Sequence, residues 1–265
     1  MLRCSSGSEC LVTDLYGQGA YDLRLDWGPA GAEAAAADIS IVVDVLSFST
    51  SVTIAVERGM AVYPYRWKDH RAREFAARRD AVLAVGRLEA GREGAVSAPS
   101  LSPSALLGCA PVARLVLPSP NGSTIAAALD HPGSTVVAGC LRNARSVADW
   151  VRSVRRPGRA IAVIAAGERW GSDASLRPAL EDQLGAGAIV SHLCSAGGVG
   201  SISPEAEAAA MTFDTAAGHL SEMMHACVGG RELADRGYGA DVHVAAQLNA
   251  SPAVPVLRGG AFVAA

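Results

Sequence analysis

Asp44 stands where an apolar segment meets a run of hydroxyl side chains. Five apolar residues surround it, and Ser47, Ser49 and Thr50 follow. A carboxylate at the end of a buried strand is costly to desolvate unless it meets a cation or a hydrogen-bond donor. The next segment is predicted to be a helix, whose first N–H groups attract anions. The pattern therefore indicates a metal-assisted site for a phosphorylated or carboxylated small molecule. Simple capping of the helix by Asp44 is the alternative.

A second candidate site is the PNGST segment, which follows another predicted strand. Its last four residues are Asn121, Gly122, Ser123 and Thr124. Backbone N–H groups and hydroxyls at the start of a helix can bind the oxygen atoms of an anion. Asn and Gly also tolerate the backbone conformations of tight turns, so an ordinary turn is the alternative interpretation.

Two adjacent acids, Glu181 and Asp182, lie near the start of a predicted helix over 179–194. Mg²⁺ binds one or two carboxylates together with water and ligand oxygens, so this pair could hold that ion. The sequence that follows, LGAGAIV, is apolar and made of small residues, which indicates that one of the acids faces inward. The alternative is that both acids are exposed and stabilise the N-terminus of the helix.

Two further loops contain charged or amide side chains. Arg142 and Asn143 follow one predicted strand, and Glu168 follows another. Arginine matches phosphate, sulfonate or carboxylate groups through its two-pronged guanidinium. Arg142 could therefore clamp an anion, with Asn143 as a donor. The alternative is that Asn143 caps the following helix and that Arg142 lies on the surface; Glu168 is open to both kinds of interpretation.

A strand, a polar loop and a helix follow one another four times between residues 39 and 193. This alternation is typical of a parallel sheet covered by helices, in which ligands bind beyond the carboxyl ends of the strands. The candidate residues lie in the loops at those ends, so we expect them to form one shared site. The predicted strands are 21–27, 39–45, 60–65, 81–85, 113–117, 134–139, 159–166 and 253–257.

The segments between these strands are predicted to be helices or connections. The predicted helices are 52–59, 68–80, 125–130, 147–154, 179–194, 203–227, 231–237 and 241–248. Residues 28–38 are predicted to be an Ala- and Gly-rich connector. Residues 86–110 are rich in Gly, Pro and Ser, and we expect an irregular flap there. The whole chain, 1–265, is predicted to form one domain.

The composition limits the class of protein. The chain has 265 residues, a formal net charge of −3 and 50% hydrophobic residues. A substantial core can form from a chain of this size, and the charge argues against nucleic-acid binding. Neither a signal peptide nor an apolar run long enough to span a membrane is recognisable. The six cysteines show no CxxC or zinc-ligand spacing. We therefore expect a reduced, cytoplasmic protein without membrane contact.

The sequence also argues against several reaction mechanisms. Lys68 is the only lysine, and it lies in no nucleotide-binding or nucleophile motif. The GxSxG, GxGxxG and GxxxxGK[ST] motifs are absent. Covalent aspartyl-phosphate enzymes of the haloacid dehalogenase type have a second Asp two residues after the first. Leu46 stands at that position after Asp44, which disfavours this mechanism.

Taken in order, these segments resemble the 2-phosphosulfolactate phosphatase family, or ComB-like proteins. The resemblance covers residues 38–258 and rests on DVLSFSTS, PNGST, AGCLRNARSVA, AAGER, ALEDQLGAGAIV and RELADRGYGADVHVAAQLN. It implies a three-layer α/β/α fold with a mostly parallel, mixed sheet. It also implies Mg²⁺-dependent hydrolysis of a phosphate monoester, which releases sulfolactate on the route to coenzyme M.

The resemblance guides the assignment of residues to a site for a small anionic phosphorylated metabolite. The residues at matching motif positions are Asp44, Asn121, Gly122, Asn143, Glu181 and Asp182. We assign Mg²⁺ binding and catalysis to Asp44, Glu181 and Asp182. We assign substrate binding to Ser47, Ser49, Thr50, Asn121, Gly122, Ser123, Thr124, Arg142, Asn143 and Glu168.

Two departures from the family pattern concern charged residues. The family has Arg in a DVLRAST-like motif where this chain has Ser47, and a GER triplet where it reads GRL at 86–88. An anion-binding arginine would then come from Arg87 or Arg142. The changes favour an altered substrate or, as the alternative, a catalytically silent metabolite-binding protein on the same scaffold. A third alternative is a structural oligomer, such as a homodimer, whose interface is the helix 203–227.

Overall fold

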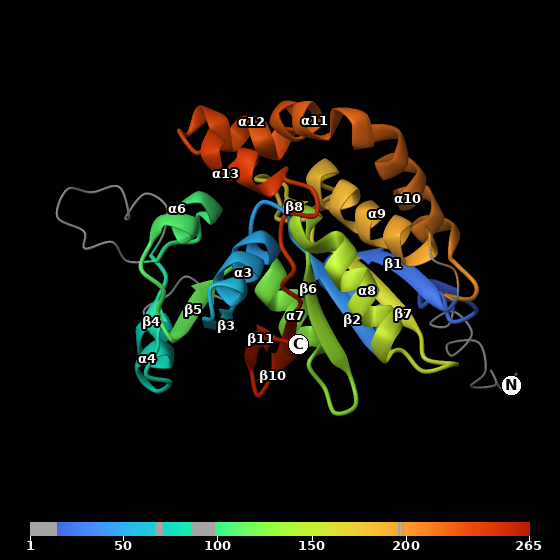
Figure 1. The fold of residues 1–265 in the computed structure, drawn as a ribbon, viewed down its shortest axis with the longest axis horizontal. Coiled ribbons are helices and arrows are strands. Elements are labelled where there is room, and N and C mark those ends of the chain that lie inside the picture. The colour runs from blue at the N-terminus through green and yellow to red at the C-terminus, as the bar shows by residue number, and fades with distance from the viewer. Residues whose placement is uncertain (1–14, 67–70, 86–98, 196, 198) are drawn as a thin grey trace, which may run out of the picture.

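A nine-stranded sheet forms the centre of the computed structural model, which describes residues 15–66, 71–85, 99–195, 197 and 199–265 (Figure 1). Its strands are β1 (Leu23–Trp27), β2 (Ile39–Val43), β3 (Ala61–Tyr65), β4 (Val82–Leu83), β5 (Arg114–Pro118), β6 (Thr135–Gly139), β7 (Ile161–Ala165), β10 (Pro255–Arg258) and β11 (Ala261–Ala264). Their order across the sheet is β1-β7-β2-β6-β10-β11-β3-β5-β4. A separate two-stranded ribbon consists of β8 (Glu168–Arg169) and β9 (Leu176–Arg177).

The sheet is mixed because the C-terminal hairpin lies inside it. Strands β1, β7, β2 and β6 are parallel to one another, and so are β3, β5 and β4. The hairpin β10–β11 joins these two groups and is antiparallel to β6 on one side and to β3 on the other. The predicted α/β fold class with a mostly parallel, mixed sheet is confirmed. The last strand had been predicted at 253–257, and its partner β11 had not been predicted.

Helices cover both faces of the sheet (Figure 1). They are α2 (Gly28–Ala35), α3 (Phe48–Glu57), α4 (Arg71–Ala77), α6 (Pro103–Gly108), α7 (Gly122–Leu129), η1 (Leu141–Asn143), α8 (Ala144–Val154), α9 (Leu180–Ser195), α10 (Pro204–Ala216), η2 (Ala217–His219), α11 (Leu220–Ala226), α12 (Val228–Asp235) and α13 (Gly239–Ala245). Helices α10, α11 and α12 follow one another along the top of the view in Figure 1.

Alternate residues of the central strands belong to two different cores. Ile41 and Val43 of β2 pack in the core that contains residues of α8 and α9. Val42, between them, packs in the core that contains residues of α2, α3 and α7. All five residues of β2 are buried. A strand covered on both faces favours apolar side chains on both, which explains the apolar run from Ile41 to Val43; the buried Ser40 donates to the Ala37 carbonyl (3.4 Å).

Small residues let α9 approach the sheet and α10 closely. A Cβ atom at Gly185 would lie 2.5 Å from Val45 Cγ2, and one at Gly187 would clash with the carbonyl oxygen of Ala209 in α10. The LGAGAIV segment therefore has a packing function that fixes the start of α9 against the ends of β2 and β7.

Three predictions of secondary structure are wrong. The connector 28–38 contains α2, since Pro29 stands in its first turn and the alanines that follow favour a helix. The helix 203–227 is broken at η2, where Gly218 has low helix propensity. The irregular segment 86–110 contains α6, which Ser102 caps by accepting a hydrogen bond from the Ala105 N–H (3.2 Å).

Some sequence expectations lie outside the described residues, among them those for Lys68, Arg87 and the flap at 86–98. Within the described part of the chain, none of the helices combines the length and the apolar character that crossing a membrane requires.

The contact between α9 and α10 predicts a specific loss of stability. Gly187→Ala should lower the free energy of unfolding by about 1–3 kcal/mol, because its new methyl group must displace the backbone of α10. Without the clash, replacing glycine by alanine would stabilise the helix, so a decrease in the free energy of unfolding would be caused by the clash. Urea denaturation followed by circular dichroism measures the change. The control is Gly218→Ala, where a Cβ meets no atom within 4 Å. Equal stability of both variants would contradict the packing argument.

Candidate active site

Asp44 lies directly after β2 and holds the starts of two helices. Its Oδ1 accepts a hydrogen bond from the Phe48 N–H (3.0 Å) in α3, and its Oδ2 accepts one from the Gly122 N–H (3.0 Å) in α7. A Cβ at Gly122 would clash with the ring of Phe48 and lie 2.9 Å from Asp44 Oδ2, so glycine is required there. Simple capping of the helix that follows, the alternative interpretation of Asp44, accounts only for the bond from Phe48. The bond from Gly122 brings together two loops that are 78 residues apart in the sequence.

Asp182 joins the loops that follow β2 and β7. Its Oδ1 accepts a hydrogen bond from the Val45 N–H (2.7 Å), and its Oδ2 accepts one from the Gly167 N–H (2.8 Å). Asp182 is 3% exposed and Glu181 is 2% exposed. Both acids are therefore buried, whereas the sequence had indicated this for one of them.

Glu181 meets the start of α12. A Cβ at Gly229 would clash with the Glu181 carboxylate, so the backbone of α12 packs directly against it. The Cys227 thiol, just before α12, donates to the Met224 carbonyl (3.2 Å) and accepts from the Gly230 N–H (3.3 Å). Burial and the charge of Glu181 raise the pKa of Cys227 to about 11, although the Gly230 N–H opposes this change. The thiol therefore keeps its proton at neutral pH.

Glu168 brings a fourth carboxylate to the same place. Its Oε2 accepts a hydrogen bond from Asn121 Nδ2 (3.1 Å), which joins the loop after β5 to the ribbon β8–β9. Burial raises the pKa of Glu168 to about 7, with a further contribution from the charge of Asp44. The Asn121 hydrogen bond acts in the opposite direction.

The four carboxylates form an acidic cluster, which we define as Asp44, Glu168, Glu181 and Asp182. Burial raises the pKa of Asp182 well above its usual range, and the charges of Asp44 and Glu181 raise it further. The N–H groups of Val45 and Gly167 oppose this rise. The like charges of the cluster are thus close enough to disfavour one another, which makes a cation a favourable ligand.

Arg177 is a cation that pairs in register with one member of the acidic cluster. In the ribbon, Arg177 of β9 pairs directly with Glu168 of β8, and such pairs have their Cβ atoms on the same side. The positive charge of Arg177 acts to lower the pKa of Glu168. Its guanidinium also lies 5.8 Å from the ring centre of Trp170, which is 53% exposed. Arg177 therefore lies where it could contact an anion at the cluster.

Four of the hydroxyls assigned to substrate binding donate to backbone carbonyl oxygens of their own loops. The bonds are Ser49 to Val42 (2.9 Å), Thr50 to Val45 (2.8 Å), Ser123 to Leu117 (3.5 Å) and Thr124 to Pro120 (2.6 Å). Ser47 is also buried. In the structure as it stands, these four hydroxyls hold the turns between strands and helices, and their assignment to substrate stays a prediction.

Arg142 and Asn143 are buried and bonded to the C-terminal part of the chain. Arg142 Nη1 donates to the Val244 carbonyl (3.1 Å) and to the Gln247 side chain, at the end of α13. Its Nε has no partner among the described residues. Asn143 accepts from the Cys140 N–H (2.9 Å) and donates to the carbonyls of Ala138 (3.2 Å) and Ala253 (3.0 Å). Their role toward a substrate also remains a prediction.

The acidic cluster suits Mg²⁺ in its donor chemistry. Within the described part of the chain, no three acidic, histidine or cysteine side chains come together in a way that would enclose a metal ion. Mg²⁺ does not need such a cage, because it commonly takes one or two carboxylates and completes its shell with water and phosphate oxygens. An ionised carboxylate has about four lone-pair sites, so a carboxylate that accepts N–H bonds can bind a metal ion as well.

Sequence reasoning missed Arg177 and Cys227 as neighbours of the cluster. Strands of two residues carry no detectable alternation, so the pairing of Arg177 with Glu168 had no signal in the sequence. A single cysteine without a spacing motif is equally uninformative. The grouping of Asp44, Glu181 and Asp182 was accessible, since all three follow strands or begin helices at one predicted edge.

Comparisons with known proteins identify the family that this chain resembles. A family model described as 2-phosphosulpholactate phosphatase matches residues 29–260. A "Probable 2-phosphosulfolactate phosphatase" of Deinococcus radiodurans is 30% identical over 229 residues, which cover 84% of this chain and 89% of that protein. A protein of the same description from Thermus thermophilus is 30% identical over 245 residues, which cover 89% and 94%.

The raised pKa of Glu168 predicts how stability depends on pH in protein kept in EDTA. The pKa rises from 4.5 to about 7 on folding, so the folded state binds the proton more tightly. The resulting stabilisation is complete below about pH 4.5 and is lost as the pH rises through about 7. When the pH rises from about 5 to about 8, the free energy of unfolding should fall by roughly 1–2 kcal/mol less in Glu168→Gln than in the parent protein.

Urea denaturation at several pH values measures this difference. Glu33→Gln, on an exposed position of α2, is the matched control and should follow the parent protein. Parallel pH profiles for Glu168→Gln and the parent would contradict the assigned protonation.

Proposed function

Because the chain belongs to the 2-phosphosulfolactate phosphatase family, we propose that it is a Mg²⁺-dependent phosphatase acting on a small acidic phosphate monoester. The substrate is 2-phosphosulfolactate or a related phospho-hydroxyacid. The observation that carries this proposal is the acidic cluster, in which loops after β2 and β7 and the start of α9 bring buried carboxylates together beside Arg177.

The charges of the site support a divalent cation as its cofactor. A phosphate monoester is a dianion and would be repelled by four carboxylates. Asp44 and one of Glu181 and Asp182 would hold Mg²⁺, and their negative charge would then be balanced. The bound ion would neutralise charge on the phosphoryl group and lower the pKa of a ligated water.

The residues of the chain position the reacting groups. Asp44 keeps its carboxylate fixed by two backbone N–H bonds, and Asp182 is held in the same way. Asn121 donates to Glu168 and holds that carboxylate beside Asp44, where it can accept a proton from an attacking water. In the first turn of α7 the Gly122 N–H donates to Asp44 and the Thr124 N–H to the Asn121 carbonyl (3.1 Å), so the Ser123 N–H is the group of this turn that can donate to a phosphate oxygen.

Arg177 supplies the positive side chain for the acidic end of the substrate. The family's arginine after the DVL motif is Ser47 here, and Arg142 is bonded to the end of α13. Arg177 stands opposite Glu168 in the ribbon, and a guanidinium group can pair with a planar anion in two-pronged fashion. We therefore assign recognition of a carboxylate or sulfonate group to Arg177.

The first test measures phosphate release from a panel of small phosphate monoesters that includes 2-phosphosulfolactate and phospholactate. Release should require Mg²⁺, and Asp44→Asn should lower kcat by about 100-fold or more, since it removes a metal ligand. The control is Asp130→Asn, an exposed acid after α7.

Thermal unfolding with and without Mg²⁺ completes this experiment. Mg²⁺ should raise the Tm of the parent protein and of Asp130→Asn, because it binds the folded state, and the rise should shrink in Asp44→Asn. A rise in Tm without phosphate release from any ester would favour the alternative, a metabolite-binding protein, for which Ser47 is the feature in the sequence. An absence of both effects would overturn the proposed site.

The role of Arg177 predicts a change in KM. Arg177→Gln should raise KM for an acidic phosphate monoester by about tenfold or more, because one charge-assisted pair is lost. Phenyl phosphate has no second acidic group, so its KM should change much less. Arg169→Gln, in the same ribbon and exposed, is the matched control. Equal effects on both substrates would contradict recognition of the acidic group by Arg177.

A further inference from the structure

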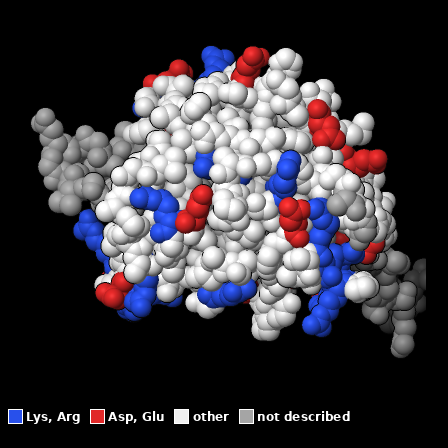
Figure 2. All heavy atoms as spheres, viewed as in Figure 1, with Lys and Arg blue, Asp and Glu red and all other residues white. Residues whose placement is uncertain are grey.

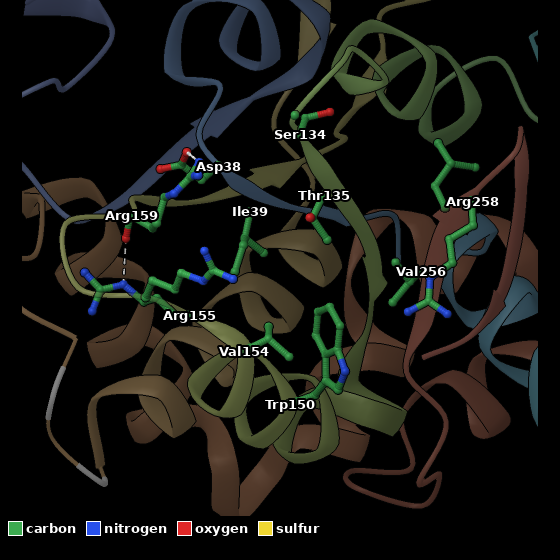
Figure 3. A pocket seen from close by; sticks show the side chains of 13 residues that line it. Asp38, Ile39, Ser134, Thr135, Trp150, Val154, Arg155, Arg159, Val256 and Arg258 are labelled. Carbon is green, nitrogen blue, oxygen red and sulfur yellow. Dashed lines mark hydrogen bonds and ion pairs between the residues drawn. The ribbon is translucent and has the colours of Figure 1, made fainter.

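A cavity lies at the end of the central strands that is opposite the acidic cluster (Figure 3). Its volume is about 380 Å³, and its wall includes Ile39 and Thr135, the first residues of β2 and β6, and Arg258, the last residue of β10. Since β10 is antiparallel to β6, its end lies at the same edge as their starts. Asp44 follows the other end of β2, so the cavity is separate from the candidate active site.

Arginine side chains give this cavity a positive charge. Four of them line it, and they are Arg155, Arg156, Arg159 and Arg258. Asp38 is the one acidic residue among the described lining residues, so the formal charge of the wall is 4 − 1 = +3. Figure 2 shows basic side chains gathered below α8, near the start of β7, where three of these arginines lie. The chain as a whole has a formal charge of −3, so this site differs in sign from the rest of the molecule.

Two of the arginines are fixed by acidic partners. Arg159 is hydrogen-bonded to Asp38, and Arg155 pairs with Asp22 (3.2 Å) and donates from Nε to the Arg159 carbonyl (2.7 Å). Burial would raise the pKa of Asp38, but the bonds from Arg159 and the Ala160 N–H hold it below its usual range. Asp38 therefore stays ionised and keeps Arg159 in place at neutral pH.

The other two arginines have no such partner. No hydrogen bond or ion pair joins the side chain of Arg156 or Arg258 to any group that the structure describes. They come from different elements, Arg156 from the turn after α8 and Arg258 from the end of β10. Two unpaired guanidinium groups on one cavity wall are the arrangement that binds anions in proteins.

The floor of the cavity is partly apolar. Trp150 and Val154 of α8 lie along it in Figure 3, and Val154 is 43% exposed. A concave site with an apolar floor and a few polar groups is typical of small-molecule binding. A flat basic surface for nucleic acid would not require such a hollow.

We propose that this cavity binds a small metabolite with at least two anionic groups, phosphate or carboxylate, held by Arg156 and Arg258. Arg159 contributes a fixed positive charge, and Trp150 and Val154 contact the carbon skeleton of the ligand. The site is independent of the proposed phosphatase reaction and would exist whether or not the chain hydrolyses phosphate esters.

Isothermal titration calorimetry with pyrophosphate and with citrate tests this proposal. The protein is treated with EDTA and then transferred into metal-free buffer without EDTA, so that anions cannot bind through a metal ion at the acidic cluster and EDTA, itself a polycarboxylate, does not compete for the cavity. We expect at least one probe to bind with a Kd below about 1 mM. The double variant Arg156→Gln/Arg258→Gln should weaken that binding by about tenfold or more, because two charge-assisted contacts are lost. Which probe binds distinguishes phosphate from carboxylate chemistry.

Two control variants separate the outcomes. Arg73→Gln, an exposed arginine of α4, and Asp44→Asn should both bind the probe as the parent protein does. The proposal is overturned if neither probe binds, if the double variant binds equally well, or if Arg73→Gln weakens binding as much as the double variant does. Loss of binding in Asp44→Asn would place the anion at the acidic cluster and would also overturn the proposal.

Discussion

Asp182 and Asp44 bring negative charge into the interior and use it to join separate segments. Each carboxylate accepts hydrogen bonds from the backbone N–H groups of two segments, and together they connect the loops after β2 and β7 with the starts of α3 and α7. The groups that would perform the chemistry are therefore also the groups that hold the loops in place. Removing either would leave buried N–H donors without partners, at a cost of about 1–3 kcal/mol each.

This arrangement requires close approach of the backbone, which explains where the glycines stand. Gly122 leaves room for Phe48 and Asp44, Gly185 for the side chains at the end of β2, and Gly229 for Glu181. Gly122 and Gly229 each let a helix start come near a carboxylate, where the positive end of the helix favours negative charge. The helix starts and N–H groups do not fully offset the burial of the carboxylates, because the pKa values of Glu168 and Asp182 remain raised. The site thus remains receptive to a cation.

The sequence predicted the parts of the fold that depend on periodicity. The buried run around Asp44, the four strand–helix units and the resemblance to a family were sufficient for the α/β class and for the convergence of Asp44 with Asp182. Pairings between distant segments were not predictable. The insertion of β10–β11 into the sheet and the pairing of Arg177 with Glu168 depend on long-range register, and short strands carry little information about it. Arg142 illustrates the same limit, since its bond to the end of α13 depends on tertiary packing.

Side chains of opposite charge gather at the two ends of the central strands, and helix dipoles account for only part of this. Acids at the start of α9 and arginines after the end of α8 both match the polarity of their helices. Arg258 does not fit this explanation, because it ends a strand that enters the sheet from the C-terminal hairpin. It faces the same cavity as Arg156 without a helix end of its own. A dipole argument explains a solvated arginine after a helix, but the convergence of cations from a strand and a helix on one hollow is better explained by a ligand.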